Sequence, residues 1–224
     1  MLVGGFVASG LISASAVLGE AAALPYDTAG ELVAAGVSIE RLADHPVVAD
    51  WRAAIAGCGL KPSTYKGSVE QLVRRTLKSG PLRTPLPLVD VYCDVAARHM
   101  APLGAYDMGL LPGSEIVLRL AEPGTDEFHP LGAARDDEMP LTPKVAVYAV
   151  GSTVICWGYN CRDSRDTCLV SDTDVGLFLG EAVTARQHEP LRAAFADLRE
   201  RLTAAGATVG EPQFASAEGS VEIA

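Results

Sequence analysis

Apolar residues recur at helical spacing in three stretches of the first half of the chain and in one stretch near its end. These stripes predict helices that begin near Pro46, Ser68 and Pro85, and a fourth helix over residues 187–205. Both prolines stand where the first turn of a helix tolerates proline, and Ser68 opens a sequence that resembles a capping box. Residues 2–24 are apolar and rich in small side chains, which predicts a strand followed by a helix.

The middle of the chain follows the pattern of strands. Residues 115–121 alternate between apolar and polar positions. Two β-rich runs, 145–150 and 153–156, are separated by a Gly-Ser pair, which predicts a hairpin, and 175–179 predicts a further short strand. Helices and strands do not alternate as βαβ units. A mixed α+β fold, with a β-sheet or sandwich core flanked by helices, fits this order best.

The length of 224 residues suits one substantial hydrophobic core. We expect a single domain over residues 1–206, with its core at about 46–181 and a C-terminal helix at about 187–205. Residues 207–224 are small and polar and predict a peripheral tail. The hydrophobic content of 49% is typical of a folded protein.

The formal net charge of −10 is unfavourable for binding a nucleic-acid backbone. We therefore expect no DNA partner, and only a local contact with any RNA. The apolar residues 1–25 are broken by glycine and serine and contain no Lys or Arg, so they predict neither a membrane span nor a signal peptide. The sequence thus predicts a cytoplasmic protein without a membrane partner.

Cysteine usage and the common motifs argue against a bound metal or cofactor. An odd number of cysteines without a C-x-x-C pair indicates reduced thiols, and their spacing matches no common zinc pattern. The chain also lacks the G-x-G-x-x-G, Walker, H-E-x-x-H and G-x-S-x-G motifs. The cysteines are Cys58, Cys93, Cys156, Cys161 and Cys168.

Two groups of residues are candidates for chemistry. Aromatic, acidic and guanidinium groups near predicted strand ends suit a pocket for an amino acid or a nucleotide end, or else form an exposed, ion-paired loop. This polar group comprises Tyr106, Asp107, Trp157, Tyr159, Asn160, Arg162, Asp163, Arg165 and Asp166. A basic group is either a solvated helix face or an RNA contact. Its members are Lys61, Lys66, Arg74, Arg75, Lys78 and Arg83.

Three segments resemble a known family: KPSTYKGSVEQLVRR, PLVDVYCDVAARHMAPLGAYDM, and CWGYNCRDSRDT with the SDT and GEAV that follow it. The chain is similar to the B3/B4 domain of the bacterial phenylalanyl-tRNA synthetase β chain, and more closely to freestanding B3/4 proteins. The resemblance covers about residues 2–181. It implies an editing module that hydrolyses the ester of a mischarged tRNA, acting in trans as an aminoacyl-tRNA deacylase.

The resemblance also implies a cleft. Tyr106 and Asp107 would lie on one wall, and the opposite wall would carry Asn160, Arg162, Asp163 and Thr167. Asp163 or Asp107 would orient the attacking water or hold the substrate ammonium, and Arg162 or backbone N–H groups would stabilise the oxyanion. Further substrate contacts are expected from Cys93, Gly104, Ala105 and Trp157. The expected tRNA contacts are Lys61, Arg74, Arg75 and Lys78.

Departures from the family pattern keep two other readings open. Freestanding members tend to have asparagine at the position of Cys93 and arginines before the N-x-R-D loop, where this chain has Cys156-Trp157-Gly158. A degenerate module would therefore bind tRNA or an amino acid without catalysis. In a third reading, Cys93 is the nucleophile of a tRNA-dependent tailoring step. The sequence does not indicate the oligomeric state.

Overall fold

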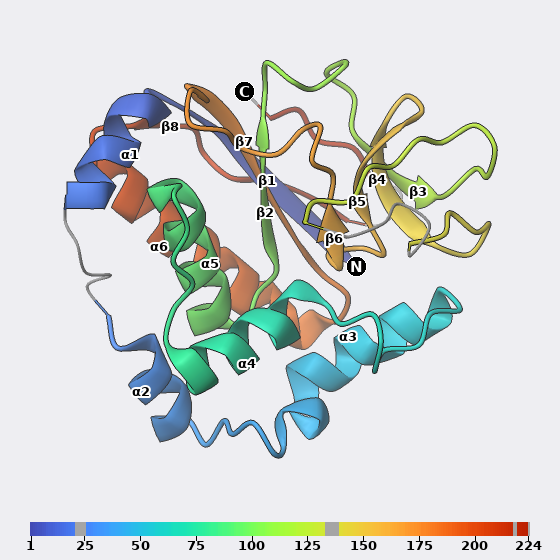
Figure 1. Cartoon of the computed structure of the whole chain (residues 1–224), viewed down its shortest axis with the longest axis horizontal. Helices are drawn as coiled ribbons and strands as arrows, with labels where there is room; N and C mark the ends of the chain where they lie inside the picture. The colour runs from blue at the N-terminus through green and yellow to red at the C-terminus, as the bar shows by residue number, and fades with distance from the viewer. Residues whose placement is uncertain (21–25, 133–138, 217–218, 224) are drawn as a thin grey trace.

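The computed structural model describes residues 1–20, 26–132, 139–216 and 219–223. Within these residues, helices and two antiparallel sheets form an α+β fold, which confirms the predicted fold class. Figure 1 shows the arrangement: helices lie on one side of the sheet that contains β1, β2 and β7, and the second sheet, β3–β6, lies on its other side.

Sheet A joins segments from both ends of the chain and from its middle. Its strand order is β2-β7-β1-β8, and β9 also pairs with β1. The central pair β1–β7 is antiparallel along its full length, from Leu2 opposite Ala182 to Ser9 opposite Val175. The strands are β1 (Leu2–Ser9), β2 (Leu103–Asp107), β7 (Val175–Ala182), β8 (Thr208–Val209) and β9 (Gln213–Ser216).

Sheet B is a meander in the order β3-β4-β5-β6. The predicted hairpin is present as β4–β5, with a bulge at Tyr148 and Ala149. Cys156 then pairs with Asp163, and Trp157 pairs with Arg162, which makes the very short β6 the edge strand. The strands are β3 (Val117–Leu120), β4 (Ala146–Val150), β5 (Thr153–Trp157) and β6 (Arg162–Asp163).

The helices cover sheet A and close one end of the molecule. Side chains of α1, α5 and α6 form the largest core cluster with one face of sheet A. A second cluster joins α2, α3 and α4 to α5. The helices are α1 (Leu11–Glu20), α2 (Thr28–Ala34), α3 (Pro46–Gly57), α4 (Ser68–Ser79), α5 (Pro87–His99) and α6 (His188–Ala204), with 3-10 turns at Leu42–Asp44 and Ala185–Gln187.

The alternation of side chains along each strand divides the core into layers. On β7, Phe178 and Ala182 face the helices, whereas Leu177 and Leu179 face sheet B. On the facing sheet, Tyr148 and other side chains of β4 and β5 complete the layer between the two sheets. Polar side chains that share this face are therefore directed between the sheets.

Local predictions at two helix starts need correction. α4 has Gly67 at its N-cap position without a side-chain cap, because the Ser68 N–H donates to Asn160 instead of taking part in a capping box. α5 begins at Pro87 rather than at Pro85. The Thr84 N–H donates to Asp90 Oδ1 at 2.7 Å, which holds the preceding residues outside the helix.

The segments on either side of the core also differ from the predictions. Residues 103–107, for which the sequence predicts neither a helix nor a strand, form β2. The tail from residue 207, expected to be peripheral, pairs with β1 at Thr208–Val209 and at Gln213–Ser216. Phe214 packs on the buried Phe195 with ring centroids 5.7 Å apart, so an apolar side chain holds the tail to the core. No helix in the described ranges is long and apolar enough to cross a membrane.

Candidate functional site

A pocket lies between the two sheets, at the end where the start of α4 approaches them. Its wall is mixed, with apolar side chains beside hydroxyl, amide and carboxyl groups. The polar and sulfur-containing side chains come from the start of α4, from β2 and β7 of sheet A, from β4, β5 and β6 of sheet B, and from the β5–β6 turn. The lining residues are Ser68, Pro102, Leu103, Gly104, Tyr106, Tyr148, Cys156, Tyr159, Asn160, Asp163, Leu179 and Glu181.

Strand geometry explains which side chains enter the pocket. Glu181 shares the sheet-B side of β7 with Leu177 and Leu179 because residues two apart point to the same face. Asp163 pairs with Cys156, so both side chains lie on the face of sheet B that looks toward sheet A. Two carboxyl groups from different sheets thus meet in one pocket.

Each carboxyl group accepts hydrogen bonds from neutral donors. The Tyr106 hydroxyl donates to Asp163 Oδ1 at 2.9 Å. Glu181 is 4% exposed and accepts from the Asn160 amide at 2.8 Å and from the Tyr148 hydroxyl at 3.0 Å. No Lys, Arg or His of the described residues forms an ion pair with either acid.

This environment moves both acids toward their protonated forms. Burial raises the pKa of Glu181 to about 7, and the nearby Asp163 charge adds to the rise, although the Asn160 and Tyr148 hydrogen bonds oppose it. Burial also raises the pKa of Asp163, against the hydrogen bonds of Cys156 and Tyr106. The pocket is therefore a place where a proton or a cation binds favourably.

Asn160 connects the pocket wall to α4. Its side-chain amide donates to Glu181, and its side-chain oxygen accepts the Ser68 N–H at 3.0 Å. The turn that carries it contains Tyr159 at φ 61°, a left-handed conformation that is uncommon for a bulky residue. Gly67 permits the close approach, since a Cβ there would lie 2.9 Å from Asn160 Oδ1. The surrounding structure holds Asn160 in place through contacts on both sides.

Two of the expected catalytic residues lie outside this pocket. Arg162 precedes Asp163 on β6 and so points to the opposite face of sheet B, where its Nη1 donates to the Leu131 carbonyl at 3.2 Å. Asp107 accepts from the Gly109 N–H at 2.7 Å and from the Thr173 hydroxyl at 2.6 Å. Its two oxygens stabilise the turn after β2. Of the three expected catalytic groups, only Asp163 lines the pocket.

The expected substrate contacts are also divided. Tyr106, Asn160 and Gly104 line the pocket, and the absence of a Cβ at Gly104 leaves room for the Tyr106 hydroxyl. Ala105 faces the helices, and Thr167 is buried with a hydroxyl that has no hydrogen-bond partner among the described residues.

Cys93 and Trp157 lie in the packed interior. Cys93 is buried on α5, and burial raises the pKa of its thiol to about 12. Trp157 is fully buried on the far side of sheet B, donates to the Pro140 carbonyl at 3.2 Å and packs edge to face on Tyr65. Neither side chain lines the pocket between the sheets.

The expected tRNA contacts lie near α4. Arg75 and Lys78 are exposed on that helix, and Lys61 is exposed after α3. Arg74 lies 3.6 Å from Glu70, whose buried carboxylate also accepts two hydrogen bonds of 2.8 Å from Arg52. The charge of Arg74 is therefore partly matched within the protein.

Sequence reasoning did not single out Glu181, Tyr148, Cys156 and Ser68 as pocket residues. For Glu181 a signal exists: it is an acid within the otherwise apolar run VGLFLGEA, and a buried strand rarely contains an unpaired charge. Tyr148 and Cys156 have no such signal, because they look like ordinary core residues. In the parts of the chain that the structure covers, no group of three or more His, Cys, Asp or Glu side chains is arranged to hold a metal ion.

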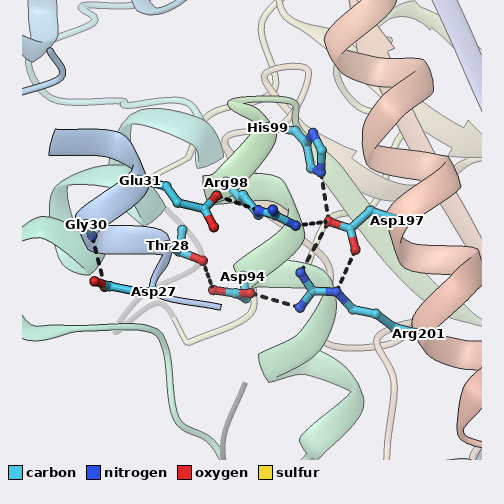
Figure 2. A network of polar contacts seen from close by, with 9 residues as sticks. All are labelled: Asp27, Thr28, Gly30, Glu31, Asp94, Arg98, His99, Asp197 and Arg201. Carbon is cyan, nitrogen blue, oxygen red and sulfur yellow. Dashed lines mark hydrogen bonds and ion pairs between the residues drawn. The ribbon is translucent and has the colours of Figure 1, made fainter. Parts of the chain in front are cut away.

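A second cluster of acids lies between α2, α5 and α6, and Figure 2 shows its contacts. Arg201 donates to Asp94 Oδ2 at 2.9 Å and to Asp197 Oδ1 at 2.7 Å. Asp197 also contacts Arg98 at 3.1 Å and His99 at 2.8 Å. Here arginine and histidine side chains surround the carboxylates, and His99 is a partnered structural residue.

A family model described as the B3/4 domain matches residues 50–193. The match begins in α3, ends early in α6 and includes every residue that lines the pocket between the sheets. None of the curated proteins matches the chain.

Proposed function

The chain belongs to the B3/4 domain family, and on that premise we propose that it is a freestanding, trans-editing aminoacyl-tRNA deacylase. Its reaction would be hydrolysis of the ester that joins an amino acid to the 3′ end of a mischarged tRNA. The observation that carries this proposal is the pair of acids, Asp163 and Glu181, which share one pocket and form no ion pair with any described residue.

The chemistry of the substrate fits this pair. An aminoacyl ester carries a positive ammonium group next to its carbonyl, so a pocket with two carboxyl groups that form no ion pair among the described residues attracts it. Binding of the ammonium would favour the ionised form of a carboxyl group whose pKa is raised. We assign the ammonium to Glu181, whose position is fixed by Asn160 and Tyr148.

Asp163 would orient the attacking water and accept its proton. A raised pKa brings a carboxylate closer to the range where it is an effective general base near neutral pH. Its Oδ1 is held by Tyr106 at 2.9 Å, which orients the carboxyl group. Because Arg162 lies on the other face of sheet B, we expect backbone N–H groups or the vicinal ribose hydroxyl to assist at the carbonyl.

The pocket also bears on the two other readings. A binding module without catalysis would use the same ammonium site and would lack turnover. The reading with Cys93 as nucleophile has less support, since its buried thiol, with a pKa raised to about 12, contains little thiolate at neutral pH. For the tRNA, we propose local contacts with Lys61, Arg75 and Lys78, with a smaller part for Arg74.

The test is release of the amino acid from a panel of mischarged tRNAs, measured for the wild type and for Asp163→Asn. We expect fast release from at least one tRNA–amino acid pair, and a loss of about 10²–10⁴-fold in kcat for the variant, the usual contribution of a general base. Asp166→Asn is the matched control, because Asp166 is an exposed acid three positions along the same loop. It should keep full activity.

Two outcomes decide against the proposal. Full activity of Asp163→Asn, with an unchanged melting temperature, would remove Asp163 from the mechanism. No release from any pair, with tRNA or amino acid still bound, would identify a binding module.

A further inference from the structure

A second pocket lies on the face of sheet B that points away from sheet A. Its walls come from the segment before α4, from α4 itself and from β5 and β6. Residues that define it include Thr64, Tyr65, Lys66, Gln71, Trp157 and Arg162. We call it the Arg162 pocket.

The charge of this pocket is opposite to that of the pocket between the sheets. Lys66 and Arg162 line it, and the described lining residues include no Asp or Glu. The alternation along β6 produces the contrast, since Asp163 and Arg162 are consecutive and point to opposite faces. One two-residue strand therefore supplies an acid to one pocket and a guanidinium to the other.

The cations of the Arg162 pocket keep unused hydrogen-bond donors. A guanidinium has five N–H donors, and Arg162 donates one to the Leu131 carbonyl, while its Nε is buried and has no partner within the described residues. Lys66 donates from Nζ to the Ser63 carbonyl at 2.7 Å, and an ammonium group has three donors. A buried guanidinium N–H without a partner is unfavourable unless a ligand accepts from it.

We propose that the Arg162 pocket binds a phosphate group of the tRNA acceptor end. Arginine and lysine together are the usual partners of a phosphate, and Gln71 and Thr64 add neutral polar groups to the same walls. This inference rests on the proposed function. An aminoacyl-tRNA carries an ammonium on its amino acid and phosphates on the adjoining nucleotides, which matches an acidic and a basic pocket on either face of β6.

Two segments supply side chains to both pockets. β6 provides Asp163 to one pocket and Arg162 to the other, and its outer edge is paired with residues 129–131, where the Leu131 N–H donates to the Asp163 carbonyl at 2.8 Å. The segment before α4 also passes both sites, with Lys66 at the basic pocket and Ser68 at the acidic one. On β6 the opposite charges come from consecutive positions, and at the start of α4 a cation and a hydroxyl group come from positions two apart.

The experiment measures binding of uncharged tRNA as a function of salt, for the wild type, Arg162→Gln, Lys66→Gln and the double variant. Loss of one phosphate contact in a single-stranded end lowers the slope of log K against log salt by about 0.7, so the double variant should lose about that amount and each single variant a part of it. Lys144→Gln, an exposed cation away from the pocket, is the control and should keep the wild-type slope.

Two further measurements separate the possible sources of the anion. Inorganic phosphate is added as a competitor, and hydrolysis of a methyl ester of the preferred amino acid is compared with hydrolysis of the charged tRNA. We expect the variants to raise KM for the tRNA severalfold and to leave methyl ester hydrolysis unchanged.

An unchanged affinity and slope in correctly folded variants would overturn the inference. Phosphate binding that the variants abolish, with no change in tRNA binding, would also overturn it, because the pocket would then hold a free anion. A lower slope in a protein that hydrolyses no ester would leave the phosphate site standing and refute only the deacylase.

Discussion

The two clusters of buried acids in this protein solve the same electrostatic problem in opposite ways. Between α5 and α6, Asp94 and Asp197 are surrounded by Arg201, Arg98 and His99 (Figure 2). Burial alone would raise the pKa of Asp197, but the hydrogen bonds from His99 and Arg201 hold it well below its usual range. In the pocket between the sheets, every hydrogen bond that a described residue donates to the acids comes from a neutral group, and the pKa of Glu181 rises to about 7.

The contrast separates a structural role from a functional one. The helix cluster is complete within the protein: Arg201 contacts both acids, and the Tyr26 ring lies 4.4 Å from its guanidinium and 3.9 Å from that of Arg98. A ligand is not needed there. The acids of the pocket are unfavourable in the ionised state until a cation binds, and such groups are concentrated at functional sites.

The largest effect should come from breaking the helix cluster. Arg201→Ala leaves Asp94, whose side chain is 1% exposed, with an unpaired buried charge, and removal of one partner of such a pair costs about 3–5 kcal/mol. Chemical denaturation measures the loss. Arg199→Ala, which removes an ion pair to the exposed Glu211, should cost less than about 1 kcal/mol. A similar cost for both variants would show that the buried ion pairs of Arg201 contribute no more to stability than an exposed ion pair.

The next largest effect concerns the pH dependence of stability. Because the folded pKa of Glu181 lies above its ordinary value of 4.5, the folded protein binds the extra proton, and stability falls as pH rises from about 4.5 to about 7. The shift corresponds to about 3 kcal/mol. Glu181→Gln should remove this decline, since an uncharged amide still hydrogen-bonds with Asn160 and Tyr148. Denaturation midpoints at several pH values measure the effect. If the stability of Glu181→Gln fell with pH as much as that of the wild type, another group with a raised pKa would be the cause.

The smallest of the three effects concerns the connection between α4 and the pocket. Asn160→Ala removes the donor to Glu181 and the side-chain acceptor of the Ser68 N–H, which keeps the Asn160 backbone carbonyl at 3.1 Å as an acceptor. The loss should cost about 1–2 kcal/mol. The pKa of Glu181 should rise further, because a donor to its ionised form is lost. Ser68→Ala is the control and removes only a hydroxyl contact of 3.4 Å. Equal stability of Asn160→Ala and the wild type would mean that water replaces the amide.

Much of the fold follows from local patterns. The stripe of apolar residues places the helices α3, α4 and α6 near their observed bounds, and the Gly-Ser pair marks the β4–β5 hairpin. α4 begins at Ser68 as predicted but without the predicted capping box, and α5 begins at Pro87 rather than Pro85, because contacts with Asn160 and Asp90 override local capping preferences. Residues 213–216 pair with β1, and Phe214 packs on Phe195 of α6. Contacts between such distant segments leave no local pattern in the sequence.

The amino-acid sequence by itself determined the α+β class, the family and a short set of polar residues that includes Asp163, Tyr106 and Asn160. Only the tertiary structure decided which of these residues meet. Register and alternation on β6 direct Asp163 and Arg162 to opposite faces, and the pairing of distant strands brings Glu181 to Asn160 at 2.8 Å. The physical reason is that local propensity acts over a few residues, whereas a pocket forms between segments that are joined only by packing and hydrogen bonds.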